Sequence, residues 1–159
     1  MNTLPSLAAR FRFNEQALEK ATGDFTDDDW LYRINGTSSH ALWLLGHLAV
    51  SRRALLRGSG KERPPAPWEA AFTKGSRPMD GKDGPSPQAL KADLVASGEL
   101  LEAHLGSLTP EQAAAPYSRT MPDGSSTIDG AAHFLHWHET YHIGQLGLLR
   151  RACGKPGLA

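Results

Sequence analysis

The stretch His138-Glu139-Thr140-Tyr141-His142 lies near the C-terminal end of the 159-residue chain, in a segment whose apolar residues recur with helical spacing. On an α-helix, residues four positions apart lie on one face about one turn apart, so both imidazoles point toward the same place. Their ring nitrogens are then able to share a divalent cation at roughly 2.0 to 2.1 Å each. The stretch therefore predicts a helix that carries two metal ligands on one of its faces.

The helix that contains this stretch is predicted to begin after Thr127, a good N-cap, and to end near Cys153, where a glycine and a proline follow. At about 100° per residue, one stripe of the helix carries both histidines and is expected to face the core. Gln145 on this stripe is able to support a ligand through a hydrogen bond, while Gly144 and Gly147 predict close packing against a neighbouring helix. The stripe consists of Ala131, Leu135, His138, His142, Gln145 and Leu149.

Glu139 makes the stretch match the H-E-x-x-H pattern of zinc proteases. The residues that follow do not support that interpretation, because no histidine and no acidic residue occurs after the stretch. Gln145 and Leu148 stand where the metzincin pattern has a glycine and a third histidine. A third ligand must therefore come from upstream, where His47 lies in the mostly apolar run 41–50. A histidine in such a run is either buried and hydrogen-bonded or buried and ligated.

Hydrophobic periodicity and capping residues predict three further long helices and two short turns. A connection rich in glycine, proline and charge separates the second and third long helices, and its length suits a crossover along a bundle. No alternation typical of strands occurs, so the predicted fold is all-α, with a single domain over residues 1–159. The predicted segments are a first helix from Pro5 to Gly23, a turn at 26–30, a second helix from Ser38 or Ser39 to Arg57, the connection 58–86, a third helix from Ser86 through Leu105, and a turn at 109–112.

Two motifs stand out in this order along the chain: Trp43-Leu44-Leu45-Gly46-His47-Leu48 followed by Arg52-Arg53, and His138-x-x-x-His142-Ile143-Gly144-Gln145-Leu146. Together they resemble the DinB-like (YfiT-like) superfamily of metal-dependent enzymes, and the likeness spans nearly the whole chain. The resemblance implies a four-helix bundle with a three-histidine metal site, to which the second helix gives one ligand and the last helix two. Residue by residue, these positions fall on His47, His138 and His142.

Three histidine ligands leave a divalent ion with open positions, which is the arrangement expected of a catalytic site. Zn or Ni is the expected metal, with Fe or Mn as alternatives. Relatives in the superfamily act as thiol-dependent S-transferases and isomerases, so the resemblance favours an enzyme that activates a low-molecular-weight thiol as thiolate. A metal-dependent hydrolase, with a metal-bound hydroxide as nucleophile, is the alternative enzyme. Binding of a metal or small ligand without turnover is a third hypothesis.

Two residues near the predicted ligands are candidates for proton transfer, Glu139 and His40. Glu139 is offset by about 100° from His138, so it either reaches solvent at the metal or lies at the surface or behind a ligand. His40 lies two turns before His47, roughly 10 Å along the axis, which is too far to bind the same ion but close enough to line the approach to it. Its simpler interpretation is a histidine at the start of a helix.

The 17 basic and 17 acidic residues cancel, which leaves no broad positive field to attract nucleic acid. The single Cys153 cannot form an internal disulfide, and neither a signal peptide nor an apolar run long enough to cross a membrane is recognised, so a cytoplasmic protein is expected. Arg52, Arg53, Arg57 and Arg63 gather at the end of the second predicted helix. They either hold an anionic co-substrate or form a solvated basic face.

The outward side of the final predicted helix carries His133, His136 and Trp137. The two histidines are expected in solvent or in an interface, and Trp137 suits a contact between subunits. Bundles of the resembled superfamily often pair as two-fold dimers. The predicted assembly is therefore a homodimer that binds a small-molecule substrate.

Overall fold

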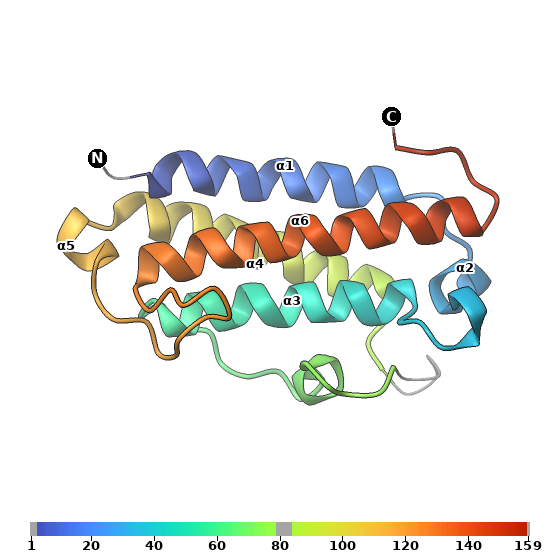
Figure 1. The fold of residues 1–159 in the computed structure, drawn as a ribbon, viewed down its shortest axis with the longest axis horizontal. Helices are drawn as coiled ribbons and strands as arrows, with labels where there is room; N and C mark the ends of the chain where they lie inside the picture. The colour runs from blue at the N-terminus through green and yellow to red at the C-terminus, as the bar shows by residue number, and fades with distance from the viewer. Residues whose placement is uncertain (1–2, 79–83, 159) are drawn as a thin grey trace.

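The computed structural model describes residues 3–78 and 84–158. Over these residues it contains helices and one isolated bridge between Pro116 and Thr127, but no strand, so the prediction of an all-α fold is confirmed. Four long helices of the described part run side by side along the longest axis (Figure 1). They are α1 (Leu4–Thr22), α3 (Ala41–Gly58), α4 (Pro87–Ser107) and α6 (Ile128–Ala152).

Each long helix packs mainly against two of the others, since α1 contacts α4 and α6, and α3 contacts the same pair. The apolar side chains meet between the helices in two clusters. One cluster contains Trp43 and Leu146, and the other contains Phe11 and Leu55. Burying one such side chain is worth about 1.5–3 kcal/mol. This packing fixes α3 and α6 close enough for their side chains to meet.

Short helices lie at the two ends of the molecule, α2 (Asp27–Leu31) at one and α5 (Pro110–Ala113) at the other (Figure 1). α2 begins with a capping box, in which the Thr26 amide donates to Asp29 Oδ2 at 2.8 Å and the Asp29 amide donates to Thr26 Oγ1 at 3.3 Å. Within the described ranges, no helix combines the length and the apolar character needed to cross a bilayer. Two 3₁₀ turns complete the elements, η1 (Ile34–Gly36) and η2 (Glu69–Phe72).

The starts of α4 and α6 follow the sequence prediction. The hydroxyl of Ser86 accepts from the Ala89 amide at 3.2 Å, and that of Thr127 accepts from the Gly130 amide at 3.1 Å. The predicted serine cap of α3 is wrong. His40 takes that place, and its Nδ1 accepts from the Trp43 amide at 3.0 Å. A ring nitrogen at this position accepts from an amide of the first turn that has no partner within the helix.

The connection between α3 and α4 folds back onto α3, and residues 79–83 of it lie outside the described residues. Phe72 is fully buried, and a Cβ on Gly46 would overlap the atoms of its ring. Gly144 and Gly147 of α6 predict close packing against a neighbouring helix, and this prediction is wrong. Nothing lies within 4 Å of a Cβ built on Gly144, and Gly147 faces Leu158 of the C-terminal segment rather than a helix.

The arginines at the end of α3 hold carboxylates inside the protein. Arg52 and Arg53 are only 1% and 6% exposed, so both predicted roles, an anion site and a solvated basic face, are wrong for them. A buried guanidinium needs a partner because an unpaired charge in the interior is costly. The pairs are Arg52 with Glu15 and Glu139, Arg53 with Glu69 and Asp93, Arg57 with Glu69, and Arg63 with Asp93.

Candidate metal centre

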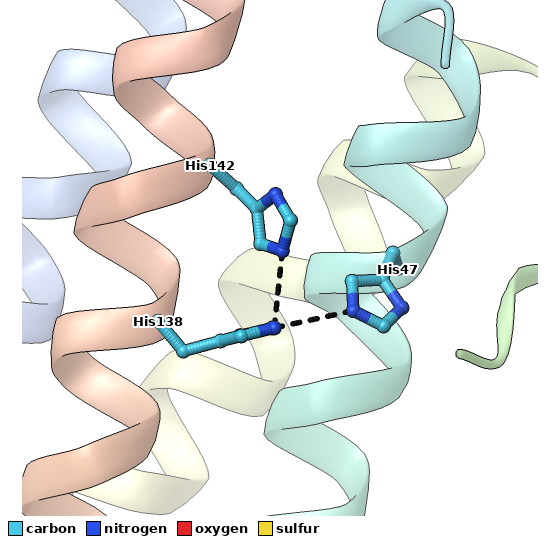
Figure 2. A group of neighbouring side chains, drawn as sticks. All are labelled: His47, His138 and His142. Atoms are coloured by element: carbon cyan, nitrogen blue, oxygen red, sulfur yellow. Dashed lines mark hydrogen bonds between the residues drawn. The ribbon is translucent and has the colours of Figure 1, made fainter. Parts of the chain in front are cut away.

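Three imidazoles converge between α3 and α6 (Figure 2). His138 Nε2 lies 3.2 Å from His47 Nε2 and 3.0 Å from His142 Nε2. One ring nitrogen from each residue lies within 4.8 Å of the other two, which is the spacing of a group able to hold one ion. The structure thus brings together the three residues predicted as ligands, one from α3 and two from α6.

Two of the three rings have an acceptor that fixes their orientation. His47 Nδ1 lies 2.7 Å from the Phe72 carbonyl oxygen, and His142 Nδ1 lies 2.6 Å from Gln145 Oε1. Since these oxygens accept, each Nδ1 carries the proton and each Nε2 keeps its lone pair for the centre of the group. The predicted support from Gln145 is present. Phe72 was missed, because a backbone carbonyl leaves no signal in the sequence.

The donor set fits a divalent cation at the three Nε2 atoms. Without a cation, a proton on His138 Nε2 forms a hydrogen bond to only one of the two neighbouring Nε2 atoms, of His47 or of His142, at a time. The lone pair of the other Nε2 atom then has no partner in the group. A cation at the centre satisfies all three lone pairs at once. The His138 ring lacks the hydrogen bond that orients the other two ligands, because its buried Nδ1 has no partner among the described residues.

The electrostatics keep these rings in the protonation state that ligation needs. Burial lowers the pKa of His47, against the hydrogen bond to Phe72, and burial likewise lowers the pKa of His142. Burial lowers the pKa of His138 to about 3, with further effects from the neighbouring histidines and from the positive charges of Arg119 and Lys74. All three imidazoles are therefore neutral at pH 7, and a metal ion displaces no proton from them.

The histidines open onto a cavity of about 400 Å³. Trp43 stacks on His47 with ring centroids 4.8 Å apart, and Phe134 lies over His138 at 6.3 Å. Apolar walls beside a polar centre are typical of small-molecule sites. The remaining lining residues are Ser51, Lys74, Arg119, Pro122 and Leu135, so no carboxylate of the described residues lines the cavity.

Both candidates for proton transfer occupy other contacts. Glu139 is 3% exposed, and its two oxygens accept from Arg52 Nε at 2.8 Å and Arg52 Nη2 at 2.6 Å. Its surface alternative is wrong, and it is buried against Arg52 outside the cavity. His40 is 1% exposed and caps α3, and it does not line the cavity either.

The outward face of α6 differs in part from the prediction. Trp137 is 59% exposed, as expected of an outward residue, and His133 is exposed beside Thr3. His136 instead packs edge-on against Phe11 of α1, with ring centroids 5.3 Å apart. α1 therefore covers part of the face that was expected to lie in solvent or in an interface.

Comparison with known proteins agrees with this arrangement. The sequence model of the DinB superfamily matches residues 10–146, and the chain belongs to that superfamily. No curated protein matches the chain. The match includes all three converging histidines and confirms the resemblance that the two sequence motifs predicted.

Proposed function

We propose that this chain is a metal-dependent enzyme with a DinB-type four-helix bundle, which binds a divalent ion through His47, His138 and His142 and acts on a small-molecule substrate with a low-molecular-weight thiol as co-substrate. The proposal rests on the convergence of three neutral Nε2 atoms at the floor of a cavity of about 400 Å³. Zn and Ni are the metals we expect first, because imidazole suits both.

The chain's own residues would prepare this chemistry. An ion held by three imidazoles keeps open positions and favours the thiolate form of a thiol at neutral pH. The Phe72 carbonyl and Gln145 orient two of the ligand rings and raise their basicity. Trp43 and Phe134 cover two of the rings with apolar surface, which limits the access of water.

The absence of an acid from the cavity favours thiol transfer over hydrolysis. A hydrolase gains from a general base within hydrogen-bond reach of the attacking water. Glu139 is paired with Arg52 outside the cavity, and no carboxylate of the described chain lines the cavity. A thiolate needs no such base. The thiol must come from a separate molecule, because Cys153 is the chain's single cysteine and lies at the C-cap of α6, outside the cavity.

Elemental analysis tests the metal site first. Purified wild type should contain close to one equivalent of a divalent metal, and His142→Ala should lose it. His133→Ala, an exposed histidine on the same helix, serves as the matched control and should keep it. A wild type that stays metal-free and takes up none on titration would overturn the proposal.

The second measurement tests the thiol. Cobalt-substituted protein titrated with cysteine, glutathione or 2-mercaptoethanol should show a thiolate-to-cobalt absorption band. Metal without a band for any thiol would favour the hydrolase, or binding without turnover, over thiol transfer.

We also propose that the chain forms a homodimer through the exposed face of α6. Trp137 and Tyr141 are 59% and 54% exposed, and their rings stack at 5.9 Å to form one apolar surface. Light scattering coupled to size exclusion should give twice the monomer mass for wild type and less for Trp137→Ser. A wild-type monomer would remove this part of the proposal.

A further inference from the structure

Two of the residues that line the cavity beside the histidines are exposed cations, Lys74 and Arg119, and we call this part of the lining the rim. Lys74 comes from the connection that follows η2, and Arg119 comes from the loop that joins α5 to α6. Both line the same cavity as the three ligands. Their charges also act on the ring of His138, whose protonation they disfavour. Two segments distant in sequence thus bring positive charge to the cavity that contains the metal centre.

These two cations differ from the arginines on α3. Arg52 and Arg53 have carboxylate partners inside the protein, whereas Lys74 and Arg119 have no ion pair among the described residues. No acidic side chain of the described chain lines the cavity, and the three imidazoles in it are neutral. The local charge is therefore positive although the chain as a whole has a net charge of zero. A concave surface with charge of one sign concentrates ligands of the other sign.

The rest of the lining sets the size and character of the ligand. A cavity of about 400 Å³ suits a small organic molecule. Pro122, Phe134 and Leu135 add apolar surface to its lining. A guanidinium and an ammonium both donate hydrogen bonds to carboxylate, sulfonate or phosphate oxygens, and the fork of an arginine binds two such oxygens at once.

We infer that Lys74 and Arg119 form an anion subsite, which selects a thiol co-substrate that carries a carboxylate, sulfonate or phosphate group a few bonds from its sulfur. The inference rests on the proposed function and names the class of thiol that the same site takes. The thiol lies at the histidines, the short carbon chain lies along the apolar walls, and the anionic group lies at the rim.

A matched pair of probes tests this charge selection. 2-Mercaptoethanesulfonate and 2-mercaptoethanol share their two-carbon thiol and differ in an anionic or neutral end. With cobalt-substituted protein, the thiolate band gives a dissociation constant for each. We expect the sulfonate to bind about tenfold more tightly, a ratio that corresponds to about 1.4 kcal/mol, and we expect the ratio to fall as salt is added.

Variants at the rim locate the effect. Arg119→Gln and Lys74→Gln should each reduce the preference for the sulfonate roughly threefold or more, and neither should change the affinity for 2-mercaptoethanol, because exposed ion pairs contribute on the order of 1 kcal/mol or less each. Lys20→Gln, an exposed lysine on α1, removes the same charge from a distant surface and should leave both affinities unchanged. Equal binding of the two thiols by wild type, or an equal loss of both in the rim variants, would overturn the subsite.

A thiol-free measurement separates this inference from the proposed function. If cobalt binds but neither thiol gives a band, thiol transfer fails and the subsite is still testable in metal-free protein. Trp43 lines the cavity, and its indole N–H, which donates to Ser76 Oγ at 2.9 Å, serves as an NMR reporter. Ethanesulfonate should shift this signal in wild type and not in Arg119→Gln, whereas ethanol should leave it in place. An unmoved signal with ethanesulfonate would overturn the inference.

Discussion

Replacing Glu139 with glutamine should destabilise the protein by about 2–3 kcal/mol, because its carboxylate neutralises a buried guanidinium. Arg52 is 1% exposed and donates to Glu139 at 2.8 and 2.6 Å. Breaking a buried ion pair by removing one partner costs about 3–5 kcal/mol. Arg52 keeps its pair with Glu15 and its hydrogen bonds to the carbonyls of Phe11 and Leu94, and glutamine keeps one acceptor oxygen. Because these contacts remain, the expected loss of stability is smaller than that of a fully broken buried pair.

The assay is urea denaturation of the metal-free protein, so that lost metal binding does not contribute to the difference. For a chain of this length, about 2–3 kcal/mol corresponds to a fall of roughly 5 to 10 °C in the melting temperature. Glu62→Gln, at an exposed position, is the control for loss of a carboxylate and should stay within about 0.5 kcal/mol of wild type. The double variant Glu139→Gln with Arg52→Met should recover part of the loss, since it removes the fully buried guanidinium, while Glu15, which loses its partner, is only partly buried.

Glu139→Gln with the stability of wild type would refute the reasoning. Unchanged stability combined with a large fall in kcat would identify Glu139 as a proton carrier, which is the role considered from the sequence. The structure favours a positioning role. Glu139 is adjacent to His138 on α6, and Arg52 lies one to two turns beyond His47 on α3, so the pair fixes the two helices that supply the ligands.

Three further substitutions test the hydrogen bond to a ligand ring, the packing of α3 against Phe72 and the capping box of α2. Gln145→Leu removes the acceptor of a ligand ring and should weaken zinc binding about 10- to 100-fold in a competition with a chromophoric chelator, with the fold unchanged by circular dichroism. Gly46→Ala places a methyl group against the ring of Phe72 and should cost about 1–3 kcal/mol in urea denaturation, whereas a cost below about 0.5 kcal/mol would contradict that packing. The amide of Thr26 and other hydrogen bonds lower the pKa of Asp29 to about 2, so its ionised form contributes stability that is complete above about pH 4 and declines as the pH falls toward 2. Asp29→Asn should therefore cost about 1 kcal/mol at pH 7 and less at pH 3, and a difference that does not depend on pH would contradict the assignment.

The parts of the structure that the sequence predicts well are those set by neighbours along the chain. Ser86 and Thr127 cap their helices because a hydroxyl reaches an amide three residues on. His138 and His142 face one point because they are separated by about one turn. Even within this local range, His40 caps α3 in place of the expected serine, since its Nδ1 also offers an acceptor to an amide three residues on.

The parts that the sequence does not predict depend on partners far along the chain. Arg52 and Glu139 are separated by 87 residues, and each taken alone has the character of a surface residue. Helical periodicity assigns a residue to a face of its own helix, but it does not identify the charge that meets it. The carbonyl of Phe72 leaves no side-chain signature at all. One signal in the sequence indicates that Arg52 is buried. Leu48 precedes it by about one turn and Leu55 and Leu56 follow it by about one turn, which is unusual for an arginine that faces solvent.

The metal ligands lie on helices, whereas the two cations of the rim lie on connecting segments. The three histidines lie on long helices held by core packing and by the buried Arg52–Glu139 pair, so their geometry is rigid. Lys74 and Arg119 lie on connecting segments, where substitutions leave the core unchanged. Changes at the rim should therefore alter which thiol is chosen without altering the metal site. Metal content and the preference for an anionic thiol should accordingly vary independently in variants of this chain.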